Sequence, residues 1–220
     1  MLADRAQHLT RVREMFETLD VFVFTLGLTE CWESRADGAV FPLCPGVEGG
    51  EFDPDKYAFR NQDVGEVLDD MNAFFARLKE INPKAQAILT VSPVPLMATA
   101  EPDAQVLAAT TYSKSVLRVA AESLRKQHDY IHYFPSFEVI TGAYNKGAYY
   151  ADDLRNVTDA GVNHAMSLVL KYATQGAKTD TNPAKPAPDP DPTDSSADSS
   201  TAAAKAFTEV ECDEAALDRG

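Results

Sequence analysis

The sequence predicts an α/β fold built on a parallel β-sheet. Apolar segments with strand character alternate with amphipathic helical segments over residues 1–176. The strongest apolar segment, residues 20–26, shows no alternation of polar and apolar residues, which is typical of a strand buried on both faces of a parallel sheet. The order strand, helix, strand, helix, strand, helix indicates right-handed crossovers between parallel strands.

Helices are expected where apolar residues recur at helical spacing. The first such segment carries Leu9, Val12, Phe16 and Leu19 on one face, and the second ends at the helix-breaking pair Asn82-Pro83. The helices predicted in this way cover residues 4–19, 64–81, 103–127 and 158–173.

Three strands are expected, over residues 20–26, 87–91 and 130–134. Each is a short apolar run that stops at glycine, proline or serine. Residues 31–60 are expected to be irregular, because Asp-Gly and Pro-Gly pairs interrupt them.

The composition changes after residue 176, so one globular domain over residues 1–176 and a tail over 177–220 are predicted. Residues 177–201 are rich in Pro, Asp, Ser and Ala and contain no aromatic residue. Such a segment buries too little apolar surface to offset the entropy lost on ordering, so we expect an acidic, disordered tail. A short helix over residues 202–217 is one option. The tail serves either as a solubilising segment or as a docking peptide.

The charge and the cysteines exclude several classes of function. The chain of 220 residues has a net charge of -14, which argues against nucleic acid and anionic membranes as partners. No apolar run reaches the roughly 20 residues of a membrane span, and the N-terminal segment has the pattern of a charged amphipathic helix rather than a signal peptide. The three cysteines, Cys31, Cys44 and Cys212, are widely spaced, which predicts neither a disulfide framework nor a zinc site. We therefore expect a cytoplasmic protein without metal or other cofactor, and the oligomeric state stays open.

The end of the first predicted strand has the character of a binding site. Open α/β sheets place ligands at the carboxyl ends of their strands, and here the strand ends at Gly27. A glycine allows close approach of a substrate to the backbone, and Thr29 and Glu30 add a donor and an acceptor.

Six motifs, in this order and spacing, resemble the GSCFA family. They are TLGLTECW (25–32), DGAVFPLCPG (37–46), ILTVSPVPL (88–96), YSKSVLR (112–118), YFPSFE (133–138) and YYADDLRNVTDAGV (149–162). The resemblance covers about residues 5–172. That family is similar to the SGNH hydrolases, three-layer flavodoxin-like α/β enzymes that cleave or transfer ester-linked acyl groups, often on carbohydrates.

The resemblance implies roles for two of these motifs. Residues 27–30, with Gly27, Thr29 and Glu30, correspond to the block that stabilises the oxyanion and binds substrate. Residues 153–156 fall in the register of the Asp-x-x-His block, whose histidine is the general base, but Asn156 stands in the place of that histidine.

Two departures from the family pattern bear on activity. No Gly-Ser-Cys-Phe string occurs in the chain, so the nucleophile block is expected to be missing together with the first strand and helix of the sheet. The amide of Asn156 cannot accept a proton near neutral pH, and a serine hydroxyl needs such a base in order to attack. We therefore expect an inactive or truncated ester hydrolase or acyltransferase, or alternatively a non-catalytic glycan-binding or interaction protein. Its ligand would be an acylated glycan or a small ester.

Other residues are candidates to replace the missing groups, each beside a plainer interpretation. His164 lies eight residues after Asn156 and shares a helical face with it, or it is a surface histidine. Asp153 belongs to a carboxylate pair with Asp152 or stabilises a helix start. Ser92 follows a strand, where it has either a chemical role or a place in a rigid turn. Ser113 is expected to face solvent or to bond its own helix. The resulting catalytic candidates are Asp153 and His164, and the binding candidates are Gly27, Thr29, Glu30 and Asn156.

Overall fold

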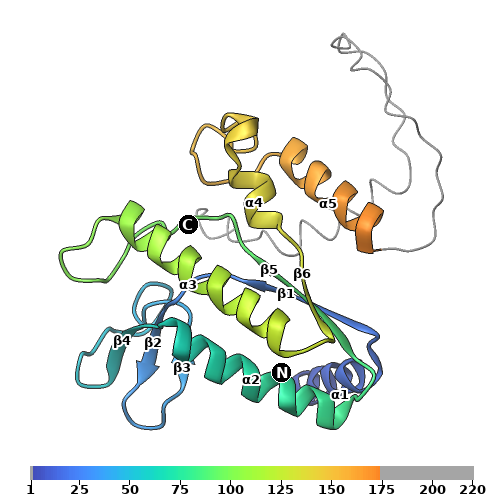
Figure 1. Cartoon of the computed structure of the whole chain (residues 1–220). Coiled ribbons are helices and arrows are strands. Elements are labelled where there is room, and N and C mark those ends of the chain that lie inside the picture. Colours follow the sequence, from blue (N-terminus) through green and yellow to red (C-terminus); the bar gives the residue numbers. More distant parts are fainter. Residues whose placement is uncertain (1, 174–220) are drawn as a thin grey trace. The chain divides into compact units, whose positions relative to one another are not determined.

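The computed structural model describes residues 2–173, so the predicted tail, its short helix and the domain boundary lie outside the described residues (Figure 1). The helices are α1 (Leu2–Thr18), α2 (Val64–Ile81), α3 (Val106–Gln127), α4 (Ser136–Thr141) and α5 (Asp159–Ala173), with a 3-10 turn, η1 (Ala143–Asn145), between the last two. The strands are β1 (Val21–Leu26), β2 (Glu30–Ser34), β3 (Val40–Phe41), β4 (Tyr57–Asn61), β5 (Gln86–Val91) and β6 (Ile131–Tyr133).

A three-stranded parallel sheet with the order β1-β5-β6 forms the centre of the fold. Val21 of β1 pairs with Gln86 of β5, and Leu26 pairs with Val91. Because all three strands run in one direction, their carboxyl ends meet at one edge of the sheet, which is the edge that open α/β folds use for ligands. The predicted α/β class, with a parallel sheet flanked by helices, is confirmed.

The hydrophobic core lies between this sheet and helices α2 and α3, which lie side by side across one face (Figure 1). The largest fully buried apolar side chains come from all of these elements: Phe75, Leu89, Val91, Leu124 and Ile131. Helix α4 packs on the other face, where the hydroxyls of Thr90 and Ser136 bond to each other. Within residues 2–173, no helix has both the length and the apolar character that a membrane span requires.

Strand β1 differs from the prediction of a strand buried on both faces. Val21 and Val23 are exposed, Val23 by 62%, whereas Phe22 packs its ring 5.3 Å from that of Phe74 in α2. The reason is that β1 is the edge of the sheet, and side chains of successive residues point to opposite faces. An unbroken apolar run does not distinguish an edge strand from a central one.

Residues 31–60, expected to be irregular, contain most of a second sheet. Strands β3, β2 and β4 form an antiparallel sheet in which Trp32 pairs with Phe41 on one side and Phe59 on the other. The Trp32 ring also contacts Phe52, at 5.2 Å between centroids. These strands are short, and β2 and β4 pair although residues 35–56 separate them in the chain, so their local sequence pattern is weak.

The antiparallel sheet is joined to the start of α2. The guanidinium of Arg60 in β4 forms ion pairs with Glu33 in β2 at 3.1 Å and with Glu66 in α2 at 2.8 Å. Asp63 caps the helix: its carboxylate accepts from the Glu66 N–H at 2.9 Å, and the Glu66 carboxylate accepts from the Asp63 N–H at 2.9 Å. This reciprocal cap fixes the chain between β4 and α2, next to the end of β1.

At the amino ends of β1 and β5, the buried side chain of Asn82 links the α1–β1 connection to the α2–β5 connection. The amide of Asn82, which follows α2, donates to the carbonyls of Phe16 at 3.2 Å and Leu19 at 2.8 Å, at the end of α1. Asn82 is 6% exposed. The chain entering β1 and the chain entering β5 are therefore held together.

Candidate functional site

The candidate site lies at the carboxyl ends of β1 and β5. The backbone N–H of Ser92, the first residue after β5, donates to the carbonyl of Leu26 at 2.9 Å, so the two strand ends stay side by side. Beyond this bond the chain leaves the sheet at Gly27 and becomes buried again at Thr29, which is 1% exposed. We call residues 27–30 the strand-end corner.

Two consecutive residues of α3 hold the corner. The hydroxyl of Ser113 accepts from the backbone N–H of Thr29 at 2.9 Å, and the ammonium of Lys114 donates to the carbonyl of Gly27 at 2.8 Å. The expectation that Ser113 faces solvent or bonds its own helix is wrong, because this residue is fully buried and binds the corner. Helix α3 thus fixes the backbone of residues 27–29.

Lys114 is a buried cation, only 3% exposed. Burial lowers the pKa of its ammonium to about 8, and the positive charge of Arg155 acts in the same direction. None of the ion pairs formed among residues 2–173 includes Lys114. A carbonyl oxygen, rather than a carboxylate, is the acceptor that this charge meets.

The side chain of Thr29 connects the corner to the antiparallel sheet. Its hydroxyl donates to the side-chain oxygen of Asn61 at 2.7 Å, and the Asn61 amide donates to the carboxylate of Glu101 at 3.1 Å. Thr29, predicted as a substrate-binding residue, uses both its N–H and its hydroxyl within the protein.

The carboxylate of Glu30 binds the loop that follows β5. One oxygen accepts from the hydroxyl of Thr99 at 2.6 Å, and the other accepts from the N–H of Ala100 at 3.2 Å. The structure therefore gives Glu30 a positioning role for this loop, and its predicted contact with substrate stays a prediction.

Asp153 and Asn156 form a tight, exposed turn. The Asp153 carboxylate accepts from the backbone N–H of Arg155 at 3.0 Å and of Asn156 at 2.9 Å, and also from the Asn156 side-chain amide. These backbone donors lower the pKa of the Asp153 carboxyl. The structure thus brings Asp153 and Asn156 together, and their side chains are hydrogen-bonded to each other.

This turn is linked to the corner through Arg155. Its guanidinium donates to the carbonyl of Pro95 at 3.1 Å, in the loop after β5, and its charge acts on Lys114. The hydroxyl of Tyr150, a few residues before the turn, donates to the carbonyl of Pro93 at 2.9 Å and is a second contact with the loop after β5. The corner and the Asp153–Asn156 turn thus meet across Lys114, Arg155 and this loop.

His164 lies in an aromatic cluster with Tyr144 and Tyr149. Its Nδ1 is 2.7 Å from the hydroxyl of Tyr149, and its ring meets the Tyr144 ring edge-on, with centroids 6.5 Å apart. The contacts of His164 within the described range involve neither Asp153 nor the corner. In residues 2–173, moreover, no serine hydroxyl or cysteine thiol forms a hydrogen bond with a histidine ring.

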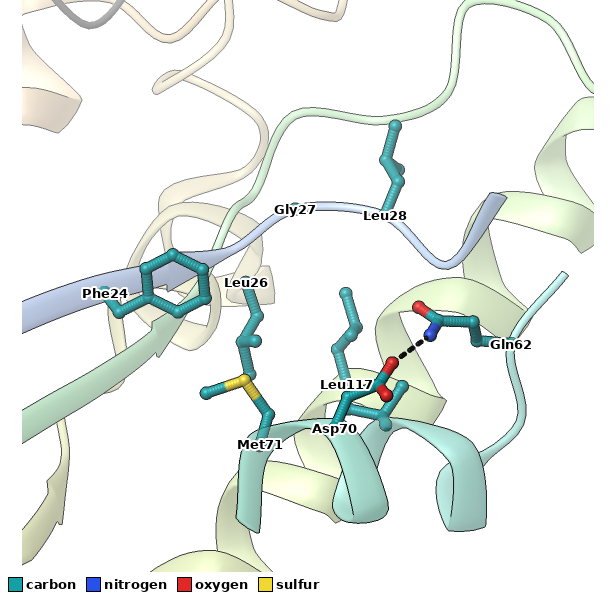
Figure 2. A pocket seen from close by; sticks show the side chains of 9 residues that line it. Phe24, Leu26, Gly27, Leu28, Gln62, Asp70, Met71 and Leu117 are labelled. Carbon is teal, nitrogen blue, oxygen red and sulfur yellow. Dashed lines mark hydrogen bonds between the residues drawn. The ribbon is translucent and has the colours of Figure 1, made fainter. Parts of the chain in front are cut away.

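A hollow of about 230 Å³ lies beside the corner (Figure 2). Gln62 donates to the carboxylate of Asp70 at 2.9 Å on one side of it. A side chain at Gly27 would have no atom within 4 Å, so this position is open. The lining is otherwise mostly apolar and comes from β1, the corner, α2 and α3: Phe24, Leu26, Leu28, Val67, Met71 and Leu117.

The side chains described by the structure do not form a metal site: no group of three or more His, Cys, Asp or Glu residues among them is placed to hold an ion. The expectation of no cofactor stays a prediction from the sequence.

Comparison with known proteins settles the family. Residues 1–168 match the family model of the GSCFA family. The chain belongs to the GSCFA family. Neither the curated proteins nor the solved structures that were compared contain a significant match. The family assignment expected from the six motifs is thus confirmed for this GSCFA chain.

Sequence reasoning missed the residues that hold the GSCFA corner from outside it, namely Ser113, Lys114, Asn61 and Arg155. One signal was present for Lys114. It lies three residues before Leu117 and seven before Ala121, which are both buried, so it occupies the apolar face of α3. A lysine at such a position indicates a specific partner in the interior.

Proposed function

We propose that this chain carries an acyl-ester pocket like that of the SGNH ester hydrolases and acyltransferases, and that it binds a carbohydrate-linked acyl ester at the strand-end corner. The observation that carries this proposal is the open position at Gly27, where the backbone borders the hollow and an added methyl group would have no atom within 4 Å. A ligand can therefore approach the backbone closely there. The expected site of action is the cytoplasm.

A second function, binding without turnover, is favoured by the contacts of the candidate catalytic groups. Asn156 bonds to Asp153, and His164 bonds to Tyr149. A serine nucleophile requires an adjacent base, and losing either partner removes most of the rate. Within residues 2–173, no serine hydroxyl or cysteine thiol is hydrogen-bonded to a histidine ring that could serve as this base.

The test of ester binding is calorimetric titration of the full chain with acetylated and deacetylated xylo-oligosaccharides. We expect binding of the acetylated form alone, weakened at least tenfold by Gly27→Ala. The added methyl meets no protein atom within 4 Å, so the variant should fold normally and oppose only the ligand. Gly49→Ala is the matched control, because a methyl there also has no neighbour within 4 Å. Equal affinity for both sugars, or equal binding by wild type and Gly27→Ala, would refute the proposal.

Turnover distinguishes the two functions. Hydrolysis of p-nitrophenyl acetate above the buffer rate, lost in Gly27→Ala and kept in Gly49→Ala, would identify a catalyst. Binding of the acetylated sugar without hydrolysis would identify the non-catalytic protein.

A further inference from the structure

The peptide between Gly27 and Leu28 has a fixed orientation. Its carbonyl accepts from the buried ammonium of Lys114 at 2.8 Å. The chain contains no cis peptide bond in its described part, and in a trans peptide the C=O and N–H point in opposite directions. The N–H of Leu28 therefore points away from the Lys114 ammonium.

The Leu28 N–H has no hydrogen-bond acceptor among residues 2–173. Leu28 is 41% exposed. It lies at the carboxyl end of β1, the edge of the sheet where ligands bind. Backbone N–H groups held in advance at such positions stabilise oxyanions, because they need no reorganisation when negative charge appears.

We propose that Lys114 is a positioning residue that orients the Gly27–Leu28 peptide so that the Leu28 N–H is presented as a donor to a carboxylate or an oxyanion. The inference rests on the proposed function, whose ester would place its carbonyl oxygen at this donor.

The charges around the corner fit an anionic oxygen. Lys114 and Arg155 bring two positive charges to this end of the sheet, although the whole chain has a net charge of -14. The acids near the corner have partners of their own: Glu30 accepts from Thr99 and Ala100, and Glu101 accepts from Asn61. Asp70, which lines the hollow, accepts from Gln62. The positive charge of Arg155 thus disfavours the ammonium form of Lys114, and the carbonyl of Gly27 is the acceptor that holds this ammonium in place.

A charged group in this position is costly, which argues for a specific role. Burial lowers the pKa of Lys114, so the ammonium is less stable here than in water. A neutral side chain of the same length would fill the same space without this cost. What it would lose is the strong donor that fixes the Gly27 carbonyl.

The experiment follows the full chain by NMR. Between pH 6.5 and 10.5, carbon-detected spectra follow the Gly27 carbonyl carbon and the Leu28 amide nitrogen, which do not require the exchangeable proton. We expect both to shift together with a midpoint near pH 8, and we expect this transition to be absent in Lys114→Met. At pH 6.5, added acetate should shift the Leu28 amide in the wild type and shift it at least threefold less in Lys114→Met. Lys126→Met, on the exposed side of the same helix, is the control and should behave as the wild type.

Two results would overturn the inference. One is a Leu28 amide and Gly27 carbonyl that do not change over this pH range in the wild type, a measurement that needs no variant to fold. The other is an equal acetate shift in wild type and Lys114→Met. Neither result depends on the calorimetric titration with sugars, so a failure of ester binding and a failure of the Lys114 inference can be told apart.

Discussion

At the scale of single residues, Lys114 combines deep burial with a positive charge. It is 3% exposed and its pKa is lowered to about 8 by burial and by Arg155. In the unfolded chain the same ammonium titrates near its ordinary value of 10.5. Between these two values the unfolded state binds one more proton than the folded state, so stability rises with pH.

This difference predicts how stability depends on pH. Below pH 8 the full cost of the buried charge is present, and it is removed as the pH rises toward 10.5. Each pKa unit corresponds to about 1.4 kcal/mol, so the wild type should gain up to roughly 3 kcal/mol relative to Lys114→Met between pH 7 and 10.5. Urea unfolding of both proteins at several pH values measures the gain. Parallel pH curves would contradict the prediction.

Removing the hydroxyl of Thr29 should have a smaller, local effect on the stability of the fold. Thr29→Val keeps the shape of the side chain but removes the donor to Asn61, which should lower the free energy of unfolding by roughly 1–2 kcal/mol. Thr111→Val is the matched control, since its hydroxyl is exposed on α3 and bonds only the helix backbone in the described contacts. Chemical denaturation of the two variants compares them, and equal losses would show that the Thr29 bond contributes nothing specific.

The candidate site was predictable in part. Gly27 and the residues after it follow from a strand ending in glycine, which is a local pattern. The contacts of Lys114 and Arg155 at the corner were not predictable in this way. They depend on how closely α3 and the turn at 153–156 approach β1, and the spacing of residues in the sequence does not give such distances. Helical spacing relates His164 to Asn156, but the hydrogen bond of the His164 ring is with Tyr149, which precedes α5 and lies outside any helical periodicity.

At the scale of elements, the capping of α2 makes a testable contribution. Asp63 accepts from the N–H of Glu66, and Asp63→Ala leaves this donor without its partner. The expected loss is about 1 kcal/mol of unfolding free energy, whereas Asp63→Asn keeps an acceptor in place and should lose much less. Thermal unfolding of the pair measures the difference. If alanine and asparagine are equally destabilising, the charge and not the cap is responsible.

The elements were predictable where the pattern is local. The helix expected over residues 64–81 is α2, Val64–Ile81, because its apolar spacing and its Asn-Pro end are both within the segment. Helix α3 begins at Val106 rather than at 103, since Asp103 has a φ of 59°, outside the helical region. The antiparallel sheet was missed because its pairing is non-local: β2 and β4 are partners although residues 35–56 separate them in the chain.

At the scale of the whole molecule, β1 leaves one edge of the parallel sheet unpaired within the described residues. Such edges template association with other strands. Val23→Lys places a charge on this edge at a side chain that is already 62% exposed, so it should reduce self-association and change stability by less than roughly 0.5 kcal/mol.

Light scattering at high protein concentration checks this expectation. Val119→Lys is the control, because it adds the same charge at an exposed position on α3. An equal reduction by both variants would point to net charge and not to the edge of the sheet.

The buried amide of Asn82 has a consequence for how this edge opens. It joins the last turn of α1, the entry to β1 and the connection before β5 through two carbonyls, those of Phe16 and Leu19. An edge strand such as β1 would otherwise separate from the sheet by itself, but here its separation must also release the end of α1. The first helix and the first strand should therefore exchange their amide hydrogens in a single cooperative event, and Asn82→Ala should divide that event into two.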